Sequence, residues 1–335
     1  MSPITPQDAI IDLTQQSEET DNRTLFAQDV LTGLSKKQKT LSSRYFYDGI
    51  GSQLFQQIMN LPEYYLTNCE YDILNRNKAE ISRLFAQTDY FHLVDLGAGD
   101  ALKTKIIIKE LAQQEFSFDY VPIDISGDAM QALTNNFSAE IPEINVQAVI
   151  GEYFEALEWL HQNKPERKVI LFLGSNIGNF TLAESIFFLQ KVRSYMQPGD
   201  SLFLGADMRK DPEIILEAYN DITGITAAFN LNLLQRINRE LEGNFQVDQF
   251  KHYTLYNPLA GVMQSFLISQ KKQEVYIGAT GKTFQFDAWE AIHTESSHKY
   301  TLSGIEQMAH ESNLRVETVF WDPRNYFADM LLIAE

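Results

Sequence analysis

A glycine-rich turn after an apolar run is the first feature of the sequence that could do chemistry. Residues 93–103, LVDLGAGDALK, form a short strand, a turn with Gly97 and Gly99, and the start of a helix. Backbone N–H groups at such a turn point into an open crevice, which suits a nucleotide or nucleoside. The alternative is a turn that only packs a helix on a strand. Leu102 stands where a dinucleotide fingerprint needs a small residue, and Asp95 suits a cationic ligand better than a pyrophosphate.

Acidic and aromatic residues end the next two predicted strands. Asp124 comes 25 residues after Gly99, where an acid can accept hydrogen bonds from ribose hydroxyls. Its alternative role is to cap the helix that follows Ser126. Glu152 and Tyr153 end the third strand, where they could contact the amino group and ring face of an adenine.

A second glycine-containing loop, GSNIGNF at 174–180, ends the fourth strand. Asn176 and Asn179 could be turn residues only. Because the carboxyl ends of parallel strands line the crevice in which open α/β sheets bind ligands, four such loops on one edge favour a ligand site.

Alternating strands and helices must position these loops. Apolar runs predict strands at 91–96, 118–124, 145–151, 168–174 and 201–207, and helices are expected at 103–113, 129–137 and 182–196. Strands this apolar, alternating with helices, predict a parallel sheet covered on both faces. A helix at 301–312 and strands at 315–322 and 327–334 follow, and the last two strands predict an antiparallel edge hairpin.

The alternation is interrupted after residue 207. Residues 212–241 are predicted helical, and two strand-like runs, MQSFLISQ and QEVYIGATGKTFQF, come next. We therefore expect a doubly wound α/β domain at 68–207 and 299–335, and an inserted α+β substrate-binding domain at 23–67 and 208–298. Residues 1–22 are polar and are expected to be flexible.

The bulk composition limits the class of protein and its partners. The 335 residues are 44% hydrophobic and carry a net charge of -18, which argues against binding to a nucleic-acid backbone. The single cysteine, Cys69, excludes an intramolecular disulfide, and the six histidines lack metal-ligand spacing. With neither a signal peptide nor a membrane-length apolar run, we expect a cytoplasmic, monomeric enzyme without metal or membrane partner.

The order of these features resembles a class I S-adenosylmethionine-dependent methyltransferase with a Rossmann-like sheet. The closer resemblance is to the histidine Nα-methyltransferases of the ergothioneine pathway, which have an inserted substrate domain of this kind. The stretches that carry it are RYFYDGIGSQLFQQIMNLPEYYLT, LVDLGAGDALKT, FLGSNIGNF, AYNDITGITAAFNLNLLQRINRELEG and HTESSHKY. They span about residues 43–300 in the family's order.

The resemblance implies which residues contact the methyl donor. Tyr47 would pack at its methionine end, and Gly97 and Lys103 would line its site, with Lys103 holding the carboxylate. Asp124 would bind the ribose. The adenine would be met by Glu152 and Tyr153, where the family usually has Asp and Phe.

The resemblance also implies a site for L-histidine. Tyr64 would approach the α-amino group, and the amino and carboxylate groups would be fixed by Gly174, Asn179 and Tyr219. The imidazole would be faced by Met263, Glu295 and Ser297. A carboxylate at Glu295 that accepts from an imidazole N–H would select histidine over an apolar or indole side chain. Its alternative is an exposed glutamate at a strand end.

Methyl transfer from a sulfonium needs a neutral amine held in line with the sulfur–methyl bond. Tyr64 and Asn179 could orient such an amine without adding charge, and no catalytic base is evident. The resemblance implies three successive transfers. The alternatives are the same reaction on another amine, such as a tryptophan derivative, or a binding module without turnover; a nicotinamide oxidoreductase is disfavoured by Leu102.

Overall fold

The computed structural model describes residues 10–14 and 22–335. They fall into two compact units. The sheet unit comprises residues 10–14, Leu66–Met208 and Tyr300–Glu335, and the inserted unit comprises residues 22–65 and Arg209–Lys299. Each unit has its own buried apolar core.

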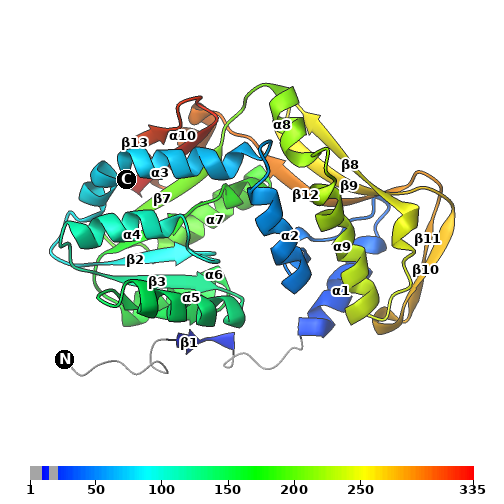
Figure 1. Cartoon of the computed structure of the whole chain (residues 1–335), viewed down its shortest axis with the longest axis horizontal. Coiled ribbons are helices and arrows are strands. Elements are labelled where there is room, and N and C mark those ends of the chain that lie inside the picture. The colour runs from blue at the N-terminus through cyan, green and yellow to red at the C-terminus, as the bar shows by residue number, and fades with distance from the viewer. Residues whose placement is uncertain (1–9, 15–21) are drawn as a thin grey trace. The chain divides into compact units, whose positions relative to one another are not determined.

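The sheet unit is built on one long sheet, ordered β1-β5-β3-β2-β6-β7-β14-β13 (Figure 1). Its strands are β1 (Ile10–Asp12), β2 (Phe91–Leu96), β3 (Phe118–Asp124), β5 (Ala148–Ile150), β6 (Lys168–Phe172), β7 (Ser201–Asp207), β13 (Leu314–Trp321) and β14 (Phe327–Ala334), and the short β4 (Asn145–Val146) also pairs with β3. The pairs from β1 to β7 are parallel, whereas β14 is antiparallel to both β7 and β13. This confirms the predicted doubly wound sheet with an antiparallel C-terminal hairpin.

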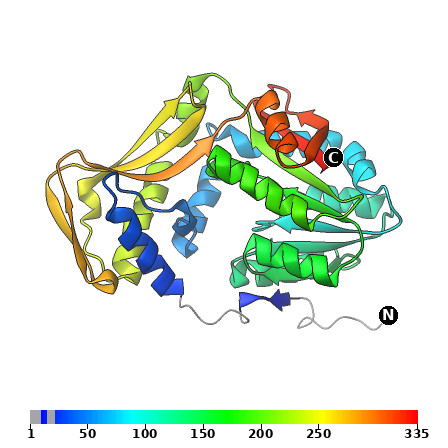
Figure 2. The ribbon, with the colours of Figure 1, turned by 180° about the vertical axis from the view of Figure 1, so that it is seen from behind.

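Helices cover both faces of this sheet because its strands are apolar on both sides. One face packs on α6 (Tyr153–Asn163), α7 (Leu182–Tyr195) and α10 (Leu302–His310), and Figure 2 shows α7 in front of the strands. The other face carries α3 (Tyr65–Phe85), α4 (Thr104–Gln113) and α5 (Gly127–Glu140), with α3 and α4 in front of the strands in Figure 1. Ligand-binding loops can therefore emerge only at the strand ends.

The inserted unit pairs helices with a small antiparallel sheet. Its helices are α1 (Asn22–Leu34), α2 (Gly49–Met59), α8 (Pro212–Tyr219) and α9 (Ile225–Glu240), with 3-10 turns η2 (Ser43–Tyr45), η4 (Val247–Gln249) and η5 (Gly278–Thr280). The sheet, ordered β12-β9-β8, consists of β8 (Phe250–Asn257), β9 (Val262–Ser269) and β12 (Ala291–His298), and β10 (Gln273–Ile277) forms a hairpin with β11 (Lys282–Phe286). Helices α8 and α9 pack against β8.

Several sequence predictions need correction. Residues 1–22 were expected to be flexible, but Ile10–Asp12 pair with β5 as a parallel strand; residues 1–9 and 15–21 lie outside the described residues. The predicted strand 145–151 is divided into β4 and β5, and the helical region 212–241 consists of two helices. Helix α6 and strands β8 and β12 were not predicted.

Among the helices of residues 10–14 and 22–335, none combines the length and hydropathy that crossing a membrane requires.

Because the core of the sheet unit is tightly packed, we expect removal of one of its aromatic rings to lower the free energy of unfolding strongly. Phe172 is fully buried, and its ring stacks on that of Phe188 at 4.4 Å between centroids. We expect Phe172→Ala to lower the free energy of unfolding by about 3–5 kcal/mol, because the surroundings only partly fill the cavity. The control Phe187→Ala, at a side chain that is 53% exposed, should cost less than about 1 kcal/mol. Calorimetry of both variants measures this, and equal losses would contradict the packing described.

Candidate active site

The turn after β2 has the backbone geometry of an open ligand loop. Gly97 and Gly99 have φ of +73° and +54°, which side chains other than glycine rarely adopt. A Cβ at Gly97 would lie 2.8 Å from the Tyr153 hydroxyl oxygen. The Gly97 N–H donates to the Ile123 carbonyl at 2.8 Å, which joins the turn to the end of β3. The positive φ therefore favours glycine here, and a Cβ at this position would also force the Tyr153 side chain to shift.

Asp124 at the end of β3 supports this turn. Its carboxylate accepts hydrogen bonds from the Gly99 N–H at 3.2 Å and the Ser126 N–H at 3.0 Å. Helix α5 is capped instead by the Ser126 side chain, which accepts from Ala129 N–H, so the helix-cap alternative for Asp124 is wrong. Burial raises the pKa of Asp124, although the backbone hydrogen bonds counteract this.

Asp95 has a structural role beneath the loop. It is buried, and its Oδ2 accepts from the Thr104 hydroxyl at 2.6 Å and the Tyr120 hydroxyl at 2.9 Å. Burial raises the pKa of Asp95 to about 6, against the lowering effect of these hydrogen bonds. This acid therefore joins the start of α4 to β3, which accounts for its place ahead of the glycines without a cationic ligand.

Lys103, predicted to hold the donor carboxylate, forms an ion pair with Glu70 of α3. Glu70 is 1% exposed, and its second oxygen accepts from the Gly174 N–H at 2.7 Å. Burial acts to lower the pKa of Lys103, but the charge and hydrogen bond of Glu70 raise it above its usual range. Glu70 thus contacts both Lys103, which was predicted to bind the methyl donor, and Gly174, which was predicted to bind the amino acid.

A second buried carboxyl, that of Asp329 in β14, lies beside Glu70. A Cβ at Gly205 would come 2.4 Å from Glu70 Oε1 and 3.1 Å from Asp329 Oδ1, so this glycine makes room for both groups. Asp329 is 0% exposed, and neither of its oxygens has a hydrogen-bond partner within the described residues. Burial, and secondly the charge of Glu70, raise its pKa well above the usual range, although Lys103 opposes them. Sequence reasoning missed Glu70 and Asp329, because no motif marks either.

The remaining predicted residues of the sheet unit lie at the same strand ends. Gly174 has φ of +75° and precedes the 3-10 turn η3 (Asn176–Asn179), in which Asn179 is exposed. The Asn176 amide donates to the Leu173 carbonyl at 3.0 Å. Glu152 is exposed at the start of α6, whereas the Tyr153 ring packs edge-on against Phe172.

The inserted unit positions its predicted residues through a β-bulge. The register of β12 on β9 shifts between His293 and Glu295, so that Ile292 pairs with Leu267, Glu295 with Ser265, and Ser297 with Met263. Alternate residues 263, 265 and 267 face the same side of β9 and are buried. The bulge therefore moves Glu295 and Ser297 onto this buried face, together with Met263. Without it, Glu295 would point to the opposite side.

The electrostatics of this face centre on Glu295. Burial raises the pKa of the Glu295 carboxyl to about 7, and the charge of Lys299 acts to lower it. Lys299 donates from Nζ to the Tyr219 hydroxyl at 2.8 Å and to the Ser297 hydroxyl at 2.9 Å. Sequence reasoning missed Lys299. Its place four residues after Glu295 could have indicated it, because residues i and i+4 of a strand lie on the same face.

Aromatic rings extend from Tyr219 along the inserted unit. Tyr64 lies 6.3 Å from Tyr219 and 6.2 Å from Phe55 between ring centroids, and Tyr47 lies 5.4 Å from Phe55. Tyr47 is 48% exposed. The predicted residues Tyr47, Tyr64 and Tyr219 are therefore connected through one aromatic cluster.

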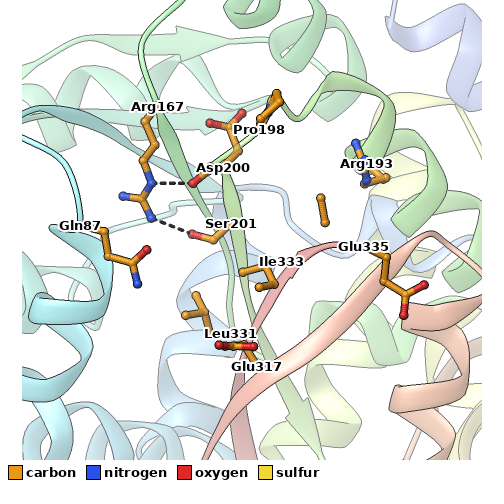
Figure 3. Close-up of a pocket in the computed structure, with 12 residues that line it drawn as sticks. Gln87, Arg167, Arg193, Pro198, Asp200, Ser201, Glu317, Leu331, Ile333 and Glu335 are labelled. Carbon is orange, nitrogen blue, oxygen red and sulfur yellow. Dashed lines mark hydrogen bonds between the residues drawn. The ribbon is translucent and has the colours of Figure 1, made fainter.

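A separate pocket lies at the opposite end of the sheet-unit strands (Figure 3). Its lining includes Ser201 at the start of β7 and Ile333 near the end of β14. Arg167 donates there to the Gly199 carbonyl at 2.6 Å. None of the predicted site residues lines it. Among the described residues, no group of three or more His, Cys, Asp or Glu side chains could hold a metal ion.

The strand order, the antiparallel β14 and the glycine turn define a class I S-adenosylmethionine-dependent methyltransferase. A family model described as "Histidine-specific methyltransferase, SAM-dependent" matches residues 26–334, and the chain belongs to this family. The predicted family and methyltransferase activity are thereby confirmed.

Curated relatives support this assignment. The chain is 39% identical over 274 residues to a histidine N-alpha-methyltransferase of Mycobacterium tuberculosis, covering 82% of this chain and 84% of that protein. It is 36% identical over 307 residues to the enzyme of that name from Mycolicibacterium smegmatis, covering 91% and 94%. A 4-dimethylallyltryptophan N-methyltransferase of Aspergillus fumigatus is 28% identical over 333 residues, covering 94% of each chain.

The buried Asp329 carboxyl predicts a pH-dependent stability. A carboxyl whose pKa is raised by folding stabilises the fold below its unfolded pKa of about 3.9 and loses that contribution as the pH rises toward its folded pKa. The Asp329→Asn variant has no carboxyl group at this position. Its free energy of unfolding relative to that of the unchanged protein should therefore grow with pH, by up to about 1.4 kcal/mol per pH unit. Unfolding midpoints between about pH 5 and 9 measure this.

The matched control for this measurement is Asp89→Asn, at an exposed loop position of the same unit. Its difference from the unchanged protein should not vary with pH. A constant difference for Asp329→Asn as well would contradict a buried, neutral Asp329.

Proposed function

We propose that this enzyme transfers methyl groups from S-adenosylmethionine to the α-amino nitrogen of L-histidine. Three transfers would give the trimethylated betaine, as the resemblance to ergothioneine-pathway enzymes implies. The observation that carries the choice of substrate is the buried face of the inserted unit, where the bulge places Glu295 beside Ser297 and Met263. A carboxylate on such a face favours an imidazole, which can donate an N–H to it, over an indole with its larger apolar surface.

The sheet unit supplies residues suited to the methyl donor. S-adenosylmethionine, when bound, provides an electrophilic methyl group on a sulfonium. The turn at Gly97 offers close backbone approach, and Asp124, which lies beside it, could accept from the ribose hydroxyls. Lys103 would hold the donor carboxylate and Tyr47 its methionine end, with Glu152 and Tyr153 at the adenine. The ion pair with Glu70 fixes where the Lys103 ammonium lies.

The acceptor amine must be neutral when it reacts. We assign Tyr64 and Asn179 to this task, because a phenol and an amide can orient an amine by hydrogen bonding without adding charge. Gly174 and Tyr219 would fix the amino and carboxylate groups. No general base is required within this scheme, since a small neutral fraction of the α-amino group exists near neutral pH.

The aromatic cluster suits repeated methylation. Each transfer replaces a hydrogen-bond donor by a methyl group, until the product nitrogen carries a fixed positive charge. The faces of Tyr64 and Tyr219, whose centroids are 6.3 Å apart, could receive that charge through cation–π contact.

We further propose that the enzyme acts as a cytoplasmic monomer without metal, nucleic-acid or membrane partners. The neutral thioether leaving group needs no Lewis acid. The net charge of -18 is unfavourable for binding nucleic acid.

The direct experiment is incubation of the protein with S-adenosylmethionine and single amino acids. We expect successive methyl additions, read by mass spectrometry, on L-histidine and not on tryptophan. Methylation of tryptophan or its derivatives with histidine untouched would overturn the proposal.

Glu295→Ala should separate histidine recognition from donor binding. Loss of the carboxylate leaves the imidazole N–H without its acceptor, so kcat/KM for histidine should fall by about 100-fold or more. The Kd for S-adenosylmethionine, measured by calorimetry, should stay within about twofold. The control Glu274→Ala, at an exposed residue of β10, should change neither value. Equal losses of histidine use and donor binding would show that Glu295 has another role.

A further inference from the structure

Lys299 is a buried lysine on the same face as the predicted histidine site. It follows β12 directly, and Glu295, Ser297 and Lys299 are alternate residues that share one side of the strand. Lys299 is only 2% exposed. Lysine is almost never buried to this degree without compensating contacts.

The backbone around Lys299 fixes its position. Its N–H donates to the Gly261 carbonyl at 2.7 Å, and its carbonyl accepts from Arg209 Nε at 3.4 Å. The side chain therefore extends from an anchored point of the strand end, and Nζ lies 4.6 Å from the centroid of the Tyr219 ring.

The hydrogen bonds of Lys299 set the direction of two hydroxyl groups. An ammonium group can only donate, so the oxygens of Tyr219 and Ser297 must accept from it, at 2.8 and 2.9 Å. Their own hydrogens must then point away from Lys299. The two hydroxyls also lie 2.9 Å from each other. One hydroxyl therefore donates to the other, and the three groups form a hydrogen-bonded corner that carries the positive charge of Lys299.

We propose that Lys299 is a specificity-determining residue that, together with Tyr219, binds the α-carboxylate of the amino-acid substrate, while Ser297 stays at the imidazole side of the same face. The inference rests on the proposed function and deepens it. The carboxylate is the only anionic group of histidine, and a charged donor cluster is its natural complement. The imidazole is a poorer match, because it readily becomes cationic and its N–H is a donor suited to Glu295.

A different role for Lys299 would produce a different result. Its charge acts to keep Glu295 ionised, and if that were its whole effect, Lys299 would serve imidazole recognition alone. Ligands with and without a carboxylate would then depend on it equally. Histidine and histamine provide this comparison, since histamine lacks only the carboxylate.

The test measures Kd for L-histidine and for histamine by calorimetry, in the presence of S-adenosylhomocysteine. We expect Lys299→Met to weaken histidine about 10- to 100-fold, the effect of losing a charge-assisted hydrogen bond, and histamine by less than about threefold. Lys299→Arg should lie between, since it keeps the charge. The control Lys251→Met, at an exposed residue of β8, should change neither Kd.

Equal weakening of both ligands by Lys299→Met would overturn the inference. If that variant does not fold, Lys299→Gln, which keeps a donor but lacks the charge, decides between the same two outcomes. Failure of the unchanged protein to bind or methylate histidine would instead contradict the proposed function itself, so the two failures are distinguishable.

Discussion

The arrangement of the sheet unit depends on the buried carboxylate of Glu70. One of its oxygens pairs with Lys103 at the start of α4, and the other accepts from the backbone N–H of Gly174 after β6. A single side chain of α3 thereby holds two loops that follow different strands. Removing one partner of such a buried pair typically costs about 3–5 kcal/mol, because the other charge remains buried. The spacing of the two loops is therefore strongly constrained.

Neighbouring residues are adapted to this interaction. Gly205 provides space that any other side chain would fill, and Asp329 adds a second carboxyl to a cluster with one lysine. Two adjacent carboxylates in a buried site disfavour simultaneous ionisation, so the ion pair between Glu70 and Lys103 is most stable with Asp329 neutral. In the inserted unit, the bulge in β12 has a comparable importance, since it determines which face Glu295 and Ser297 occupy.

The sequence predicted those parts of the fold that follow from continuous apolar runs. The strands 91–96, 118–124 and 201–207 have the predicted bounds, because residues buried on both faces leave no ambiguity of pattern. Strands β8 and β12 were missed, since their half-exposed surfaces mix lysine, histidine and threonine with apolar residues. Helix α6 was also missed; it begins at Tyr153, only two residues after the end of the predicted strand 145–151.

The site residues also divide into those that a sequence pattern indicates and those that only the structure reveals. Gly97 and Asp124 could be found from their positions relative to a strand, and in the structure Asp124 accepts a hydrogen bond from Gly99, in the same turn as Gly97. Glu70, Asp329 and Lys299 are single charged residues whose importance arises only from their burial and partners. A bulge is a phase shift of one residue, and no periodic pattern of the sequence reveals it. The ligand roles assigned to the individual residues stay predictions.

The central claim is that the methyl groups are placed on the α-amino nitrogen of histidine. The most direct measurement is an NMR spectrum of the product formed from L-histidine and S-adenosylmethionine labelled with 13C in its methyl group. The account predicts that the label accumulates in one trimethylammonium resonance coupled to the α-carbon. Label on an imidazole nitrogen would contradict it.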